Sequence, residues 1–277
     1  MARRHIALAL LLLPGCTASA THQAGDDRAG DMAAIPAGTF VAGTDSAELP
    51  ALLERYHTRH ADLFTAEIPK HSVRVAAFAI DRTEVTKARF RDFLLAAPAW
   101  RKDAQLASAG NGHYLEDWTG TDFPVGEGAR PVAFVTWPAA RAFCAWEGTR
   151  LPTEAEWEFA ARGGLSDPEF PWGSDQPDAT RANWSGAGVG HTSDVGRYPA
   201  NGYGLFDMAG NVWEYVADPW SVDTTRLSAA ARAEGPGTRY VIRGGSYEGA
   251  AVNLRVRYRD SHPAGGAGPH VGFRCAR

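Results

Sequence analysis

The sequence predicts an α+β fold in a single domain with little regular secondary structure. Its 277 residues include 30 Gly and 17 Pro, so turns and irregular loops should dominate. The 9 Trp residues can supply buried area where regular packed elements are scarce. Hydrophobic residues make up 44% and charged residues 22%, as in globular proteins. The formal net charge of −4 argues against a nucleic-acid partner, because nucleic-acid-binding proteins usually carry a basic field.

The first 16 residues have the pattern of a signal peptide. A basic start at Arg3 and Arg4 precedes a short apolar run, residues 6–13, which cannot span a bilayer. The run ends in Leu-Pro-Gly-Cys, which resembles a bacterial lipobox whose cysteine, Cys16, is acylated and becomes the mature N-terminus. A plain signal peptide cut nearby is the alternative. We expect a lipoprotein of the bacterial cell envelope that faces the periplasm or the outside and meets the membrane through its lipid anchor only.

The rest of the chain divides into a tether and a domain. Residues 17–32 are small and polar, which is typical of a flexible tether. The domain is expected over residues 33–277, without a repeat or a second linker. It should open with a strand and turn at 35–40 and a strand at 71–80, where two valines alternate with polar residues.

Three helices are predicted from their caps. Thr86 can cap the first helix. The second should start near Trp137 and end before Gly148. Thr153 and Glu156 have the spacing of a capping box and start the third helix.

The C-terminal third should be strand-rich. Residues 164–237 show little periodicity, and three strands are expected at 240–242, 254–259 and 271–275. In the middle strand the apolar residues alternate with three arginines, so the two kinds of side chain should lie on opposite faces.

Two cysteines remain once Cys16 is set aside. In an oxidising compartment the even pair Cys144 and Cys275 suggests a disulfide. Two buried free thiols are the alternative.

Six motifs resemble the formylglycine-generating enzymes, also called sulfatase-modifying factors, and occur in the order of that family. They are RLPTEAEWE at 150–158, FPWG at 170–173, NGYGLFD at 201–207, GNVWE at 210–214, RGGSY at 243–247 and GFRC at 272–275. The resemblance covers roughly the whole domain. It implies the formylglycine-generating-enzyme fold, related to the C-type lectin fold, and matches the pair Cys144–Cys275 to a structural disulfide of the family.

The resemblance also implies structural calcium as a cofactor. Calcium prefers several oxygen ligands, including backbone carbonyls. The family's site corresponds to Asp207, Gly210, Val212 and Glu214, the middle two through carbonyl oxygens. The alternative is two solvated acids in a loop. A second family site would include Asn183 and the carbonyl of Trp184, but residues 185–192, where its acidic ligand should fall, contain no acid.

Copper is not expected. The formylglycine-generating enzymes oxidise a substrate cysteine with copper held by two cysteines that shortly follow the segment matching residues 243–247. Residues 248–260 contain no cysteine, and Cu(I) prefers thiolate ligands.

The equivalent pocket wall would have different chemistry. Glu248 could act as a general base, and an arginine could hold an anionic substrate group. Alternatively, the arginines form a solvated strand face and Glu248 pairs with one of them. The histidines at 113, 191, 262 and 270 show no metal spacing. The pocket candidates are Trp213, Arg243, Ser246, Glu248, Asn253, Arg255 and Arg257, with Arg259 beyond them.

Three functions follow from these observations. The first is an exported maturation factor, oxidoreductase-like if it is an enzyme, acting on a peptide or peptide-derived substrate. It resembles the pyoverdine-maturation type of this family, which also lacks the copper cysteines. The second is a non-catalytic, lectin-like lipoprotein that displays a ligand-binding surface. The third, formylglycine generation on sulfatases, is disfavoured because the copper cysteines are absent.

Overall fold

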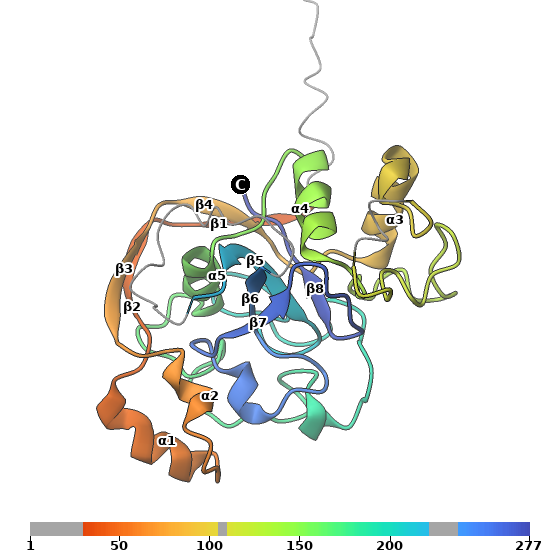
Figure 1. Cartoon of the computed structure of the whole chain (residues 1–277). Helices are drawn as coiled ribbons and strands as arrows, with labels where there is room; N and C mark the ends of the chain where they lie inside the picture. The colour runs from red at the N-terminus through yellow and green to blue at the C-terminus, as the bar shows by residue number, and fades with distance from the viewer. Residues whose placement is uncertain (1–29, 105–109, 222–237) are drawn as a thin grey trace, which may run out of the picture.

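The computed structural model describes residues 30–104, 110–221 and 238–277 (Figure 1). In chain order, the helices and strands are β1 (Met32–Ile35), β2 (Gly38–Ala42), η1 (Ser46–Glu48), α1 (Leu49–Arg55), α2 (Asp62–Thr65), β3 (His71–Val75), β4 (Phe78–Asp81), α3 (Lys87–Ala96), η2 (Pro98–Trp100), α4 (Trp137–Trp146), α5 (Glu154–Ala161), η4 (Ser185–Ala187), β5 (Trp213–Pro219), β6 (Arg239–Arg243), η6 (Ala251–Leu254), β7 (Asp260–Pro263) and β8 (Val271–Phe273).

The described strands form three small sheets. β1 pairs with β4 and β2 with β3, both antiparallel, while the central sheet has the order β7-β6-β5-β8. Within it, β5 and β8 run parallel and the other pairs antiparallel. α5 packs against β3 on one side and against β5 and β6 on the other (Figure 1). Long loops join these elements, as the glycine and proline content predicts.

The three predicted helices are present. The side chain of Thr86 accepts a hydrogen bond from the backbone N–H of Arg89 at 3.2 Å and caps α3. α4 begins at Trp137, as expected. At α5, the hydroxyl of Thr153 accepts from the N–H of Glu156, whose carboxylate accepts from the N–H of Thr153, so the capping box is complete. Local side-chain chemistry therefore sets the start of all three helices.

The strand predicted over residues 254–259 is wrong. The chain there forms the end of η6 and a turn, and the strand β7 begins only at Asp260. Both kinds of side chain in this segment are mostly buried. The apolar side chains pack in the core, while Arg255 pairs with buried Glu67 and Arg259 with buried Glu154. The sequence also did not predict β5, whose first four residues are all buried and so show no alternation.

The predicted disulfide is confirmed. Cys144 on α4 and Cys275 after β8 are bonded at 1.99 Å, and both residues are fully buried. The bond joins α4 to the end of the chain. There, the backbone of Ala276 forms antiparallel β-bridges with Ile80 of β4 and with Arg150. It therefore fixes the C-terminus against the middle of the domain.

Candidate functional site

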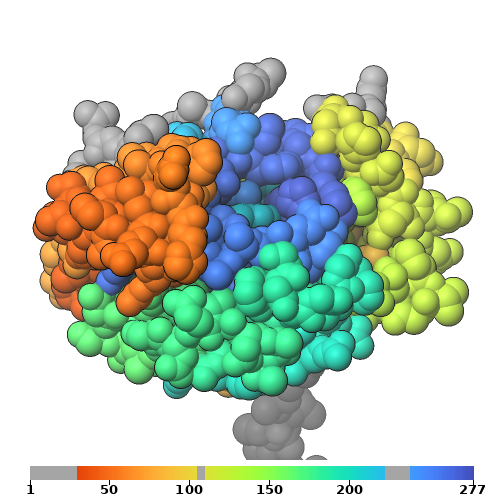
Figure 2. Space-filling view, turned by 90° about the horizontal axis from the view of Figure 1, so that it is seen from below, coloured from red at the N-terminus to blue at the C-terminus, as the bar shows by residue number. Residues whose placement is uncertain are grey.

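One face of the molecule is hollowed. Figure 2 shows a depression bordered by blue C-terminal segments, with orange N-terminal segments on one side and green to teal segments on another. The blue segments include the residues that follow the Arg-Gly-Gly-Ser-Tyr motif. The part of the chain where the pocket was expected therefore borders the hollow.

Glu248 and His270 form a partly open pair in this C-terminal region. Their side chains are 57% and 34% exposed, and His270 Nδ1 lies 3.4 Å from Glu248 Oε2. The phenol of Tyr247 lies beside the pair, and its pKa is raised by burial, by the charge of Glu248 and by a hydrogen bond to that carboxylate. An exposed carboxylate beside an imidazole can accept a proton from a bound group.

The structure brings His262 and His270 together, which sequence spacing did not indicate. Their ring centroids lie 6.4 Å apart with perpendicular planes. Tyr215 Oη lies 2.6 Å from His262 Nδ1. The pKa of His262 falls to about 4 because of burial and the nearby charges of His270 and Arg239, so the ring is neutral near pH 7.

In the described part of the chain, one group of three side chains has metal-ligand spacing. It consists of Asp81, Glu147 and Cys275. Cys275 is bonded to Cys144, so this group offers no thiolate. The two carboxylates are also paired with Arg89.

Arg243 does not line a pocket, which corrects the sequence expectation. Its guanidinium is fully buried and donates to Glu154 Oε1 at 3.0 Å and to Glu158 Oε2 at 2.7 Å. It also donates to the carbonyl of Val256 at 2.6 Å. These bonds join β6 to α5 and to the chain after η6, so Arg243 has a structural role.

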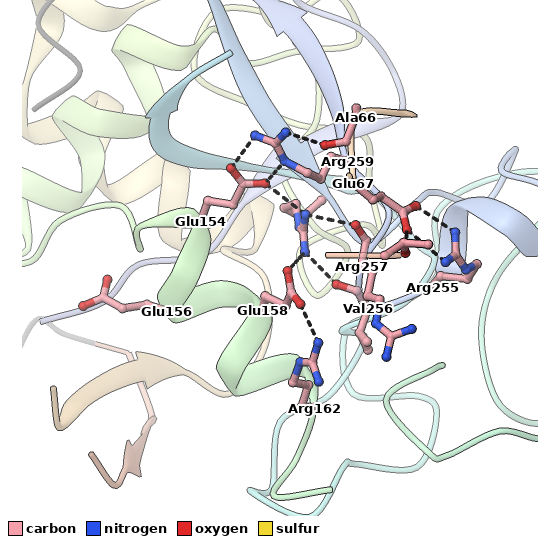
Figure 3. Close-up of polar contacts among 12 residues, drawn as sticks. Ala66, Glu67, Glu154, Glu156, Glu158, Arg162, Arg255, Val256, Arg257 and Arg259 are labelled. Carbon is pink, nitrogen blue, oxygen red and sulfur yellow. Dashed lines mark hydrogen bonds and ion pairs between the residues drawn. The ribbon is translucent and has the colours of Figure 1, made fainter. Parts of the chain in front are cut away.

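The remaining arginines of this segment are also engaged, as Figure 3 shows for two of them. Arg255 donates to both oxygens of Glu67 at 2.7 and 3.0 Å, and Arg259 donates to both oxygens of Glu154 at 2.5 and 2.9 Å. Arg257 pairs with Asp167. The solvated arginine face that was the alternative is therefore wrong as well.

The other pocket candidates are mostly buried. Ser246 is 2% exposed, and its hydroxyl accepts from the N–H of Glu248 at 3.3 Å. Trp213 is 8% exposed and packs on Tyr258, with the two ring centroids 5.9 Å apart. Asn253 accepts from the N–H of Ala250 at 2.8 Å. Of the candidate set, Glu248 is thus the charged side chain that remains open to a ligand.

The two expected calcium carboxylates have different partners. Glu214 accepts from Arg274 with both oxygens, each at 2.7 Å, and from Trp157 Nε1 at 2.8 Å. Asp207 accepts from the N–H of Gly196 at 2.6 Å. Glu214 would meet a cation only by sharing an oxygen with Arg274.

Glu84 is a third acid at this place, and sequence reasoning missed it. Its side chain is fully buried, and its pKa lies well above the ordinary value because of burial and the charges of Asp207 and Glu214. Oε1 accepts from Asn211 at 3.0 Å, and the Glu84 side chain hydrogen-bonds with the carboxyl of Asp207. The charges of Glu214, Glu84 and Asp207 all act on one buried guanidinium, that of Arg274. Two buried carboxyls that face each other can bind a calcium ion between their oxygens.

The second family site keeps part of its donor set. Asn183 is fully buried and donates to the carbonyl of His191 at 2.9 Å, while its Oδ1 has no hydrogen-bond partner. The carbonyl of Trp184 already accepts from the N–H of Ala187. The acid missing from residues 185–192 leaves this place without the negative charge that surrounds Asp207.

Calcium is expected to stabilise the domain. Chelation should lower the melting temperature and added calcium should restore it, because a ligand present at a hundredfold excess over its Kd adds about 2.7 kcal/mol. Magnesium should substitute poorly because it requires tighter octahedral geometry. Asp207→Ala or Glu214→Ala should abolish the response, measured by scanning calorimetry on metal-stripped protein.

Substitution of Glu84 is a second test of the calcium site, measured by the same change in melting temperature. Glu84→Gln should raise the stability of the metal-free protein most at alkaline pH, because burial and the charge of Asp207 make ionisation of Glu84 costly and glutamine does not ionise. The same variant should weaken the calcium response. Glu116→Gln, which changes an exposed acid, is the control and should respond like wild type. A melting curve of metal-stripped wild type that ignores calcium would contradict the assignment.

Comparison with known proteins gives consistent matches. The sulfatase-modifying factor enzyme 1-like domain family matches residues 17–277. The chain is 36% identical over 258 residues to a formylglycine-generating enzyme of Streptomyces coelicolor, covering 76% of this chain and 81% of that protein. It is 32% identical over 299 residues to the inactive C-alpha-formylglycine-generating enzyme 2 of Bos taurus, covering 91% and 89%.

A solved structure supports the same fold. PvdO from Pseudomonas aeruginosa is similar with a TM-score of 0.68 and 28% identity, covering 91% of this chain and 95% of that one. The similarity extends over nearly the whole of both chains. It confirms the predicted α+β domain of the formylglycine-generating-enzyme type.

Proposed function

Because the chain belongs to the sulfatase-modifying factor family, we propose that it is an exported maturation factor of that family. It acts on a peptide-derived substrate without a copper–thiolate site. The observation that supports this most is a partly exposed pair formed by Glu248, in the segment where the family's copper cysteines are expected, and His270, which lies beyond that segment. Residues 248–260 contain no cysteine, and both cysteines of the domain are bonded to each other.

The proposed chemistry is proton transfer at the substrate. Glu248 accepts a proton from the bound group, and His270 lies beside the carboxylate and orients it. The 3.4 Å separation of the pair exceeds a hydrogen bond, as is common for catalytic groups before a substrate closes the site. A role that needs thiolate-bound copper is disfavoured, because carboxylate and imidazole are harder ligands than Cu(I) prefers.

Two comparisons are compatible with this proposal. One relative, 32% identical over most of the chain, is named an inactive formylglycine-generating enzyme, so membership of the family does not require that activity. The similarity to PvdO extends over the whole domain at 28% identity. Neither comparison identifies the substrate.

Co-expression with a sulfatase is expected to leave the formylglycine content of the sulfatase at background. The reason is the absent pair of thiolates, and mass spectrometry of the sulfatase active-site peptide is the measurement. The Streptomyces coelicolor relative serves as the positive control. A rise in formylglycine content above background would overturn the proposal.

Deleting the gene should cause an unmodified peptide-derived precursor to accumulate. Liquid chromatography with mass spectrometry compares extracts of the deletion strain and its parent. The wild-type gene should restore the product, whereas Glu248→Gln should reduce it about a hundredfold, the lower end of the effect of a general base. Glu116→Gln is matched, because Glu116 also pairs with a histidine, at 2.9 Å, on an exposed surface. Restoration by Glu248→Gln would exclude the proposed role of this carboxylate.

The proposed location is the bacterial cell envelope, with the lipid on Cys16 as the only anchor. Residues 1–29, which hold the signal peptide, Cys16 and most of the tether, lie outside the described residues. Within the described ranges no helix has the length and hydropathy of a membrane span.

Cys16→Ser is therefore expected to release the protein from the membrane fraction while export continues. A lipid chain partitions into the bilayer, and its loss removes that binding energy. Immunoblots of membrane and soluble fractions measure the change. Extraction of the unmutated protein without detergent would contradict the anchor.

A further inference from the structure

A cavity of about 250 Å³ is lined by β2, by α5 and by the turn that follows α5. Gly38 lets the strand and the helix approach, because a Cβ atom there would lie 2.5 Å from Cζ of Phe159. All described residues that line the cavity precede residue 204, so it is separate from the region of Glu248. An apolar cavity of about 150 Å³ is enough to hold benzene, so this one has room for a ring with a polar group beside it.

One part of the cavity wall is hydrophobic. The ring centroids of Phe40 and Phe159 lie 5.7 Å apart, and those of Phe159 and Tyr203 lie 6.2 Å apart. Val41 and Leu165, which also line the cavity, are 48% and 46% exposed. They are two of the four large hydrophobic residues that are exposed in the described part of the chain. Exposed apolar surface is thus concentrated at a cavity, which is typical of a ligand-binding site.

The polar part of the wall is the guanidinium of Arg162, which is 2% exposed. It lies among three other lining residues. Cζ is 4.8 Å from the centroid of the Phe40 ring, Nη2 donates to the carbonyl of Val41 at 2.9 Å, and Nη1 donates to that of Ser166 at 3.4 Å. Within the described residues, Nε has no hydrogen-bond partner. A buried donor without a partner is costly, so this guanidinium can gain a hydrogen bond from a ligand.

The surroundings of Arg162 carry excess positive charge. Its buried carboxylate partner, Glu158, accepts at 2.7 Å but is shared with a second arginine, Arg243 (Figure 3). The pKa of Arg257 is lowered by burial and by the charge of Arg162, which together outweigh the opposite effect of nearby carboxylates. An anion at this place would therefore meet favourable Coulomb energy.

Asp167, in the turn after α5, is the exposed carboxylate beside these two cations. Its Oδ1 lies 3.7 Å from Arg162 Nη1 and pairs with Arg257. The side chain of Asp167 is 56% exposed, whereas those of the two arginines are 2% and 11% exposed. An exposed ion pair contributes little free energy, so water or another anion can replace this carboxylate at small cost. Asp167 thus marks the position that a ligand carboxylate can take.

We propose that this cavity binds a carboxylate joined to a hydrophobic group. The ligand carboxylate takes the position of Asp167 beside Arg162 and Arg257, and the hydrophobic group lies against the rings of Phe40 and Phe159. The free C-terminus of a peptide with a hydrophobic last residue and a short fatty acid share this chemistry. The inference goes beyond the proposed function and does not depend on Glu248.

Matched probes test both parts of the ligand. The probes are acetyl-glycyl-glycyl-phenylalanine, its C-terminal amide, acetyl-triglycine with a free carboxylate, and hexanoate, and calorimetric titration of the purified protein measures their Kd values. The phenylalanine acid should bind about tenfold more tightly than its amide, because a hydrogen bond to a charged group is lost in the amide. It should also bind about tenfold more tightly than acetyl-triglycine, which has no hydrophobic side chain.

The pattern of binding identifies the source of the carboxylate. Tighter binding of the phenylalanine acid than of hexanoate assigns the site to a peptide C-terminus, and the reverse order assigns it to a fatty acid. Equal affinity for the acid and its amide would overturn the proposal. So would the absence of binding by every carboxylate probe at millimolar concentration, and neither result would affect the proposed role of Glu248.

Asp167→Asn should tighten binding of the phenylalanine acid about two- to fivefold, because the competing carboxylate is removed. Asp175→Asn is the matched control, since Asp175 is also an exposed acid paired with an arginine, Arg181, at 2.9 Å. It should leave the Kd unchanged. Weaker binding by Asp167→Asn would contradict the assigned position of the carboxylate.

Leu165→Ser tests the hydrophobic part and should weaken binding about threefold, because apolar contact area is lost. The matched control is Leu95→Ser, which changes a leucine of α3 that is 51% exposed and does not line the cavity. Both leucines are on the surface, so both variants should fold. Equal Kd values of the two variants would exclude a contact between Leu165 and the ligand.

Discussion

Replacing Arg243 by methionine is expected to destabilise the domain by about 3–5 kcal/mol, the cost of removing one partner from a buried ion pair. Glu154 and Glu158 are 1% and 3% exposed, and both accept from this guanidinium. Without it, two negative charges remain in the core with fewer donors. In a domain of this size the melting temperature should fall by roughly 10 °C, measured by scanning calorimetry.

The pH dependence of stability should change sign in the same variant. Burial alone would raise the pKa of Glu158, but Arg243 and Arg162 outweigh it and hold the pKa below the ordinary value of 4.5. In wild type, Glu158 therefore contributes stability above about pH 4.5 that is lost as the pH falls further. In Arg243→Met one of the two cations beside Glu158 is lost, so burial becomes the larger effect and the pKa of Glu158 rises. Ionising this buried carboxyl then costs free energy as the pH increases, so the variant should be more stable at pH 5 than at pH 8.

Two comparisons make the Arg243 prediction specific. Glu158→Gln in the Arg243→Met background should recover part of the loss, because it removes the carboxylate left without its partner. Arg181→Met breaks two exposed pairs and should cost at most about 1 kcal/mol. Equal effects of Arg243→Met and Arg181→Met would refute the role of buried charge.

Replacing both Cys144 and Cys275 by alanine is expected to cost about 4–5 kcal/mol. The bond links residues 131 apart in sequence, and the loss of that constraint increases the entropy of the unfolded chain. Guanidinium-induced unfolding, compared with wild type, measures the difference. The effect should lie in the unfolded state, so crystals of the variant should keep α4 and β8 packed as in the parent.

Reduction of the wild-type protein provides an independent comparison. Both sulfurs are fully buried, so a reductant should act only after local opening or in denaturant. Once reduced, wild type should match the double variant in denaturant midpoint. Non-reducing peptide mapping that finds two free thiols in the native protein would remove the basis for this prediction.

The sequence predicted several elements because their signals are local. A capping box needs side chains only three residues apart, so Thr153 and Glu156 specify the start of α5 without tertiary information. The end of α4 is similar, because Gly148 follows it with a positive φ of 75° that glycine adopts readily. The disulfide was predictable because exclusion of Cys16 leaves one pair.

The central part of the candidate site was not predictable from the sequence. Tyr215 and His262 are 47 residues apart, and Glu84 and Asn211 are 127 apart, so no local spacing indicates either contact. The arginines were misassigned because an alternating pattern on a half-buried strand usually means a solvated face. Here the carboxylates that receive them come from α5 and from the segment after α2, which lie far away in sequence.

The sequence by itself therefore determined the family, the helix starts and the disulfide. Each depends on residue identity within a short motif or on a count of cysteines. Only the tertiary structure decided which charges are engaged and which remain open. Arg243 and Glu248 lie five positions apart, yet one is buried in two ion pairs and the other is exposed. The physical reason is that burial and Coulomb energy depend on distances in space, which the fold sets by joining segments remote in sequence.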